Sequence, residues 1–130
     1  MVEKSFTHDL DIACELVGLA TQKNLVVMEN FMFLYHSQQT YVKGEIDSGL
    51  IGDVRCFRSS FGFPPLSRDN IRYKKELGGG SLLDVGAYPI RASQMFLGGS
   101  LSVSAASLFV DPQLDVDIFG GAFLTNHAGL

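Results

Sequence analysis

Apolar positions near the start of the chain recur with the spacing of an amphipathic helix. Over residues 6–23 they follow one another at intervals of three and four, and Asp9 and Asp11 stand in the first turns, where carboxylates favour the positive end of the helix dipole. The next run, residues 25–32, is rich in Val and Phe and has no polar alternation in its first half. This run predicts a strand buried on both faces of a parallel sheet. Helix and strand together form half of an α/β unit.

The pattern changes twice in the middle of the chain. Residues 38–48 carry helical spacing, and Gly49 stands where a left-handed residue would end that helix. Residues 53–63 alternate instead, with phenylalanines on one face and polar residues between them. This alternation predicts a strand of a different, half-solvated sheet, whose apolar face is made of Phe57, Phe61 and Phe63.

The last part of the chain begins with three consecutive glycines, Gly78, Gly79 and Gly80, which we call the glycine triplet. A third helix is predicted directly after it, over residues 81–97. Two strands, about residues 101–110 and 116–125, follow on either side of an Asp-Pro turn signal. The order of elements predicts an α/β fold that passes into α+β.

Composition and charge exclude several classes of partner. The chain has 130 residues, with 14 acidic and 10 basic side chains and a net charge of -4. A nucleic-acid-binding protein usually needs a basic excess to neutralise phosphates, so we exclude nucleic acid. No apolar run approaches the ~20 residues that span a bilayer, and Glu3 and Lys4 place charges where a signal peptide is apolar. We expect a cytoplasmic protein without a membrane partner.

The sequence contains two cysteines, Cys14 and Cys56. They have no second pair and no histidine at metal-ligand spacing, so neither a disulfide framework nor a zinc site is predicted. We expect both to be buried, reduced thiols.

Candidate chemistry gathers at the glycine triplet. Its bare backbone would let a ligand approach closely, and the following helix would present its N-terminal amides and positive dipole end to the same place. A flexible loop is the alternative explanation of the triplet. Asp84 and Tyr88 are four residues apart, so both project from one face near the helix start, although Pro89 would kink the helix. Taken singly, Lys4, Asp84 and Tyr88 are typical of a surface lysine, a first-turn acid and a packing residue.

Four segments taken together resemble the Gfo/Idh/MocA family, the glucose-fructose oxidoreductase-like NAD(P)-dependent dehydrogenases. They are Glu3-Lys4 before a helix, residues 26–32, residues 48–54, and a Gly-Gly-Gly-x-x-x-Asp-x-Gly-x-Tyr pattern at residues 78–88, which is the most specific. The resemblance covers nearly the whole chain in the family's order. It implies the end of a Rossmann-like parallel sheet, followed by part of an open, mainly antiparallel sheet with a helix led by the glycine triplet.

The same resemblance implies a division of the chain and roles for five residues. Residues 1–50 would be a remnant of the dinucleotide-binding domain with its connecting helix, and residues 51–130 a partial α+β domain for substrate binding and oligomerisation. The implied reaction transfers a hydride between NAD or NADP and a sugar or polyol, without a metal. The implied residues are Lys4 and Tyr88 as catalytic groups, Asp84 and Arg72 at the substrate, and Glu3 with Lys4 at the cofactor.

In that arrangement Tyr88 would exchange a proton with the sugar hydroxyl. A phenol is a weak base at neutral pH unless a nearby cation stabilises the phenolate, and Lys4 would be that cation. Ser5 follows Lys4 where the family has proline.

The sequence also departs from the family in what it lacks. No strand is followed by a Gly-x-Gly-x-x-Gly turn with an acidic residue about 20 positions later, which is the signature of a dinucleotide site. We therefore expect a fragment or a truncated gene product that by itself binds neither NAD nor NADP. The alternative is a non-catalytic module acting in oligomerisation or in sugar or partner binding. Uncovered apolar surface and strand edges predict a homo-oligomer.

Overall fold

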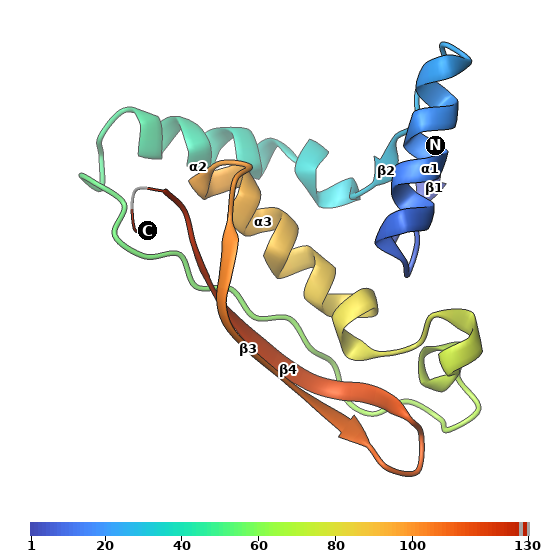
Figure 1. Cartoon of the computed structure of the whole chain (residues 1–130). Coiled ribbons are helices and arrows are strands. Elements are labelled where there is room, and N and C mark those ends of the chain that lie inside the picture. The colour runs from blue at the N-terminus through green and yellow to red at the C-terminus, as the bar shows by residue number, and fades with distance from the viewer. Residues whose placement is uncertain (128, 130) are drawn as a thin grey trace. The chain divides into compact units, whose positions relative to one another are not determined.

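The computed structural model of this chain describes residues 1–127 and 129. The chain folds as two units, Met1–His36 and Ser37–Leu130, whose elements are labelled in Figure 1. Each unit is described by itself. In the described part of the chain, no helix has both the length and the apolar character that crossing a bilayer requires.

The first predicted helix is confirmed as α1 (Leu10–Gln22). It begins four residues later than the hydrophobic spacing indicates, because Asp9 has an extended backbone and acts as the N-cap. The Asp9 carboxylate accepts a hydrogen bond from the Ile12 amide at 3.0 Å. The period of apolar residues therefore gives the existence of the helix, and the capping residue gives its start.

The predicted buried strand over residues 25–32 is much shorter in the structure. Strand β2 (Glu29–Asn30) pairs in parallel with β1 (Val2–Glu3), and residues 25–28 lie outside it. The Val26 side chain is 90% exposed, so burial on both faces is wrong. A doubly buried strand needs neighbours on both edges and layers over both faces. Among the described residues, β2 pairs with β1 alone.

The second predicted helix is confirmed as α2 (Ser37–Asp47), with the expected glycine at its end. Gly49 has φ +79°. Its amide donates to the Ile46 carbonyl at 3.0 Å, and the Leu50 amide donates to the Glu45 carbonyl at 3.2 Å. These two bonds form a Schellman motif, which satisfies carbonyls that the helix end leaves without partners.

The predicted strand over residues 53–63 is wrong, because the structure has irregular backbone there. The alternation nevertheless reports side-chain direction. The Phe57 ring lies 5.5 Å from the Phe96 ring, and the Phe61 ring lies 5.3 Å from the Tyr88 ring, measured between centroids. These phenylalanines thus pack on a helix, and the segment forms no ladder of backbone hydrogen bonds.

The third predicted helix is continuous from Leu82 to Leu97. It opens with a π-helical segment, η4 (Leu82–Gly86), and continues as α3 (Ala87–Leu97). Pro89 lies in the first turn of α3, directly after the wider π turns, and the helix continues past it. Two short 3₁₀ helices that the sequence pattern did not predict precede the glycine triplet, η2 (Ile71–Tyr73) and η3 (Lys75–Leu77).

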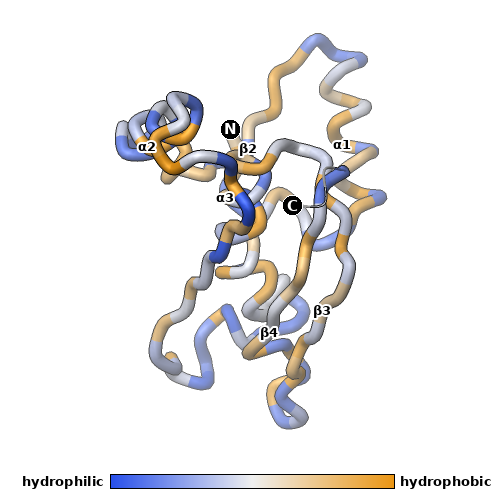
Figure 2. The backbone as a smooth tube through the Cα atoms, turned by 90° about the vertical axis from the view of Figure 1, so that its left-hand side faces the viewer, coloured by the Kyte–Doolittle hydropathy of each residue, from blue (hydrophilic) through white to orange (hydrophobic). Residues whose placement is uncertain are grey.

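The two C-terminal strands are confirmed as an antiparallel hairpin of β3 (Ser102–Asp111) and β4 (Val116–Thr125). The Asp111 carboxylate closes the turn by accepting hydrogen bonds from the amides of Gln113 and Leu114. Orange segments of both strands in Figure 2 mark hydrophobic residues, interrupted by paler serine and glycine positions. The fold thus combines a small parallel sheet, an antiparallel sheet and helices.

Both cysteines are exposed, so the prediction of buried thiols is wrong. Cys14 lies on α1, where Ala20 is the buried residue. Cys56 directly precedes Phe57, in the segment with irregular backbone.

Candidate functional site

Each residue of the glycine triplet has a steric reason to be glycine. Gly78 has φ +72° and ends η3. A Cβ on Gly79 would lie 2.7 Å from the Arg72 carbonyl oxygen, and Gly80 has φ +120°. The amide of Gly80 donates to the same Arg72 carbonyl at 2.9 Å. The triplet is therefore a hydrogen-bonded turn that brings Arg72 beside the start of the following helix.

The start of that helix is held by a carboxylate from the hairpin. One oxygen of Asp117, on β4, accepts hydrogen bonds from the Ser81 hydroxyl at 2.7 Å and from the Leu82 amide at 2.6 Å. The expectation that this helix start offers its amides to a ligand is wrong for Leu82, because Asp117 already occupies that position. The positive end of the helix dipole meets a carboxylate from the protein itself.

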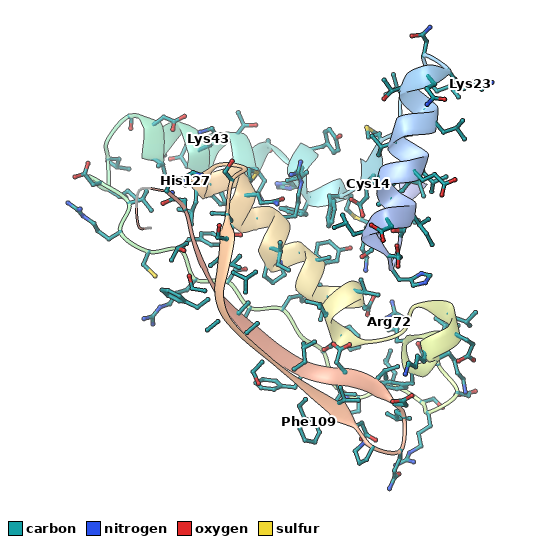
Figure 3. All side chains as sticks on the ribbon, viewed as in Figure 1. Cys14, Lys23, Lys43, Arg72, Phe109 and His127 are labelled. Atoms are coloured by element: carbon teal, nitrogen blue, oxygen red, sulfur yellow. The ribbon has the colours of Figure 1, made fainter. Side chains whose placement is uncertain are left out.

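Arg72 and Asp84, the two predicted substrate residues, are brought together. The Arg72 Nε atom donates to an Asp84 oxygen at 2.6 Å. The guanidinium carbon also lies 5.7 Å from the centroid of the Phe63 ring, a cation–π arrangement. The Asp84 side chain is 18% exposed, against 42% for Arg72. The pair thus keeps its carboxylate mostly covered and its guanidinium partly open to solvent. Figure 3 labels Arg72, close to the start of the helix.

The local sequence explains how Arg72 is placed. Asn70 precedes η2, and its side-chain oxygen accepts a hydrogen bond from the Arg72 amide at 3.1 Å. This is a short Asn-centred turn of the kind that asparagine favours. The turn and the Gly80 contact therefore fix the Arg72 backbone from both sides.

Tyr88 lies on the same continuous helix as Asp84, as predicted. Its ring meets Phe61 edge to face, and the residue is half-buried. The aromatic segment before the glycine triplet thus contributes twice to this region, with Phe61 against Tyr88 and Phe63 against Arg72. Phe61 and Phe63 therefore contact two of the predicted site residues, although their own segment has irregular backbone.

Glu3 and Lys4 belong to the first unit, at the carboxyl end of β1. The Asn30 side-chain amide donates to the Glu3 carboxylate at 2.7 Å, and the Phe6 amide donates to the Glu29 carboxylate at 2.6 Å. The Lys4–Ser5 peptide bond between these two anchors is cis, and Lys4 is half-buried.

Ligands of open parallel sheets bind at the carboxyl ends of the strands. The assignment of Glu3 and Lys4 to the cofactor stays a prediction. Lys4 and Tyr88 lie in different units, and their meeting at one cleft stays a prediction.

Polar contacts also join the segment around Arg72 to the hairpin turn. Arg68 donates to the Gln113 side chain at 2.9 Å, and Lys75 pairs with Asp115 at 2.7 Å. Both side chains of the Lys75–Asp115 pair are exposed, so this ion pair contributes little to stability. Their importance is geometric, because they join the residues before the glycine triplet to the hairpin, as Asp117 joins the residues after it.

Asp69, in the same segment, has a lowered pKa. The Ser67 hydroxyl donates to Asp69, and this bond lowers the pKa of Asp69 because it favours the charged form. Asp69 is exposed.

In the described residues, no group of three His, Cys, Asp or Glu side chains could hold a metal ion.

Sequence reasoning missed three residues of this region, Phe63 as a partner of Arg72, Asn70 and Asp117. Asn70 had a local signal, because an asparagine directly before a helix start commonly accepts a hydrogen bond from the amide two residues on. Asp117 had none, since an aspartate between valine and isoleucine in a strand is typical of a solvent-facing position. Its partners lie 36 and 35 residues earlier in the chain.

Comparison with known proteins identifies the family of this chain. Residues 40–130 match the model of the GFO/IDH/MocA C-terminal domain. The whole chain is 43% identical to a dTDP-3,4-didehydro-2,6-dideoxy-alpha-D-glucose 3-reductase of Actinomadura kijaniata, of which it covers 39%. It is also 43% identical, over 99% of its length, to the enzyme of that name from Saccharopolyspora spinosa, again covering 39%. The chain thus spans about two fifths of the length of these curated relatives.

Solved structures give the same result. KijD10, a 3-ketoreductase from Actinomadura kijaniata in complex with NADP and TDP-benzene, superposes with a TM-score of 0.94 at 44% identity, over 98% of this chain and 39% of KijD10. Structures of KijD10 with the same bound molecules also exist for a tyrosine-to-phenylalanine and a lysine-to-alanine variant, at positions 84 residues apart. From the family model, the identity and the fold together, the chain belongs to the Gfo/Idh/MocA family.

Proposed function

We propose that this sequence serves an NADP-dependent oxidoreductase that transfers a hydride between the nicotinamide and the keto or hydroxyl carbon of a nucleotide-linked sugar. The observation that carries the proposal is 43% identity over all 130 residues to 3-reductases of dTDP-linked sugars. Residues 1–50 would contribute the end of the dinucleotide-binding domain and its connecting helix, and residues 51–130 part of the substrate domain. When bound, the nicotinamide supplies the hydride.

Lys4 and Tyr88 are the proposed catalytic pair. Their separation in this sequence equals the separation of the lysine and the tyrosine that are substituted in the KijD10 variants, which supports the assignment. The Tyr88 hydroxyl would give a proton to the sugar carbonyl oxygen during reduction and accept it during oxidation. The Lys4 ammonium would stabilise the phenolate, and Glu3 and Lys4 would border the cofactor.

Arg72 and Asp84 are the proposed substrate-binding groups. The 2.6 Å ion pair holds the guanidinium through its Nε, and one terminal nitrogen donates to the Asn70 side-chain oxygen at 3.5 Å. A partly exposed guanidinium fits the phosphates of a nucleotide-linked sugar, because phosphate oxygens accept its planar donors well. Asp84 would orient a sugar hydroxyl near Tyr88.

A kinetic comparison tests the proposed activity. The natural gene product that carries this sequence should oxidise NADPH with a dTDP-linked 3-keto sugar and much more slowly with the free sugar. Tyr88→Phe and Lys4→Ala should each lower kcat by at least ~100-fold, the effect expected of a lost proton-transfer group. Tyr41→Phe and Lys43→Ala, at exposed positions on α2, are the matched controls and should leave kcat unchanged. Full activity in Tyr88→Phe would contradict the assigned chemistry.

A second proposal concerns assembly, and the surface differs from the one that the sequence suggested. Phe57 and Phe61 contact α3 and lie in a segment with irregular backbone, so they form no sheet face. The β3–β4 register instead aligns three exposed phenylalanines on one face of the hairpin, which we call the hairpin phenylalanine face. Its members are Phe109, Phe119 and Phe123, which are 56%, 71% and 64% exposed. We infer that this face is the contact between copies in a homo-oligomer.

A further inference from the structure

Strand β4 contains an irregularity next to Asp117. In the hairpin register Phe109 pairs with Phe119, and Val110 pairs with Asp117, so Ile118 has no partner on β3. Such a bulge breaks the regular alternation of a strand and redirects a side chain. In a regular strand Asp117 would face the same side as Phe119, two residues on. With the bulge, Phe119 is exposed and Asp117 reaches the start of the helix.

Asp117 and Gly80 are sterically complementary. A Cβ on Gly80 would lie 2.2 Å from one Asp117 oxygen, so a side chain there would displace the carboxylate. The other Asp117 oxygen receives both hydrogen bonds, from Ser81 and Leu82. Because Ser81 has helical backbone and makes no capping bond to its own helix, Asp117 supplies the cap from another element.

These contacts control where the proposed substrate and proton-transfer groups lie. Leu82, whose amide Asp117 holds, is two residues before Asp84 and six before Tyr88 on one continuous helix. Arg72 is attached to the same point, through its pair with Asp84 and through its carbonyl bond to Gly80. A shift of the helix start would therefore move Asp84, Tyr88 and Arg72 together.

We propose that Asp117 is a positioning residue for the reaction proposed above. It acts through the helix start, and it aligns Tyr88 and the Arg72–Asp84 pair without contact to the substrate. This inference rests on the proposed function for its kinetic consequence. A simple helix cap would change stability and leave the turnover of folded molecules unaltered, so the two roles give different results.

The test compares Asp117→Ala with Asp117→Asn in the natural gene product that carries this sequence. Asparagine keeps an oxygen that can accept from the Leu82 amide, and alanine does not. We expect kcat per folded molecule to fall about tenfold or more in Asp117→Ala, because misplacement by about 1 Å can cost that much. Asp117→Asn should restore kcat to within about threefold of wild type. Ser81→Ala, which removes one of the two bonds, should give an intermediate loss and serves if Asp117→Ala does not fold.

Asp115→Asn is the matched control, because Asp115 lies two residues before Asp117 in the hairpin turn, is exposed and pairs with Lys75. It should match wild type in kcat and in hydrogen exchange of the Leu82 amide, which should become fast in Asp117→Ala. A wild-type kcat in folded Asp117→Ala and in Ser81→Ala would overturn the inference.

The failure of the proposed function is distinguishable from the failure of this inference. If the wild-type protein reduces no sugar, the NMR resonance of the Arg72 Nε–H group decides the positioning role by itself. A change of that resonance in Asp117→Ala, absent in Asp115→Asn, would support the role. An unchanged resonance would contradict it.

Discussion

At the scale of single residues, the Arg72–Asp84 pair is the part of the candidate site that we propose to bind the substrate. Its Nε–H···O contact at 2.6 Å is short and charge-assisted, and Phe63 supports the guanidinium plane. Solvent reaches Arg72, so the pair is weaker than a fully buried one, and its main effect is orientation. A lysine could keep the charge but could supply neither the Nε donor nor the flat face.

We therefore expect Arg72→Lys to weaken binding of the nucleotide-linked sugar with little effect on folding. Loss of a hydrogen bond to a charged group costs about 1.4 kcal/mol at an open site, or roughly tenfold in KM. Arg55→Lys is the control, because Arg55 forms an ion pair with Asp53 that is exposed on both sides. Steady-state kinetics with the dTDP-linked substrate measures the difference. An unchanged KM in Arg72→Lys would remove this residue from the substrate site.

At the scale of elements, the glycine triplet joins the segment that carries Arg72 to the helix that carries Asp84 and Tyr88. Gly80 is its most constrained member, because it combines a φ of +120° with a close approach to Asp117. Gly44, on α2, is the opposite case, since its φ is ordinary and a Cβ there would meet nothing within 4 Å. Alanine at Gly80 would therefore meet both backbone strain and a steric clash, whereas alanine at Gly44 would meet neither.

Gly80→Ala should lower the free energy of unfolding by about 2–3 kcal/mol, because backbone strain adds to the displacement of Asp117. Gly44→Ala should raise it by about 0.5–1 kcal/mol, because alanine loses less conformational entropy in a helix. Urea unfolding of the two variants and the wild type provides the measurement. Equal stability of wild type and Gly80→Ala would show that the Gly80–Asp117 contact is not formed in solution.

The elements also show what the sequence could and could not predict. Local periodicity was sufficient for α1, α2, the helix after the glycine triplet and both hairpin strands, because each of these patterns depends on neighbours in the chain. Residues 53–63 alternate correctly, but a strand also needs a distant hydrogen-bonding partner, which alternation does not report. The same reason hides Asp117, whose role depends on a bulge and on residues 35 positions away.

The candidate site was predictable to a different extent. Asp84, Tyr88 and Arg72 were chosen by resemblance, and the ion pair between two of them is a geometric fact that spacing could not give. The prediction of exposed helix amides failed because a carboxylate from another element can satisfy them. Exposure of Cys14 and Cys56 was missed for a similar reason, since cysteine's preference for the interior does not say which face of an element is covered.

At the scale of the whole molecule, the hairpin phenylalanine face is the surface that we propose to contact a second copy of the chain. Phe109 and Phe119 are directly opposite each other on β3 and β4, and Phe123 continues the same face four residues further along β4. Exposed apolar patches of this kind are uncommon on monomers and mark interaction sites. At about 25 cal/mol per Å² of apolar area, covering ~300 Å² on a partner would contribute roughly 7 kcal/mol before the cost of association.

We expect the wild-type chain to form a homodimer or larger homo-oligomer at micromolar concentration, and Phe119→Glu to shift it toward the monomer. A carboxylate in the centre of the face would lose its hydration on association without gaining a partner, which is strongly unfavourable. Tyr41→Glu is the matched control, since Tyr41 is an equally exposed aromatic residue on α2, outside the hairpin. Light scattering measures the mass of each variant, and circular dichroism verifies that the helices persist. A monomeric wild type, or a Phe119→Glu variant that stays as large as Tyr41→Glu, would show that this face does not join copies of the chain.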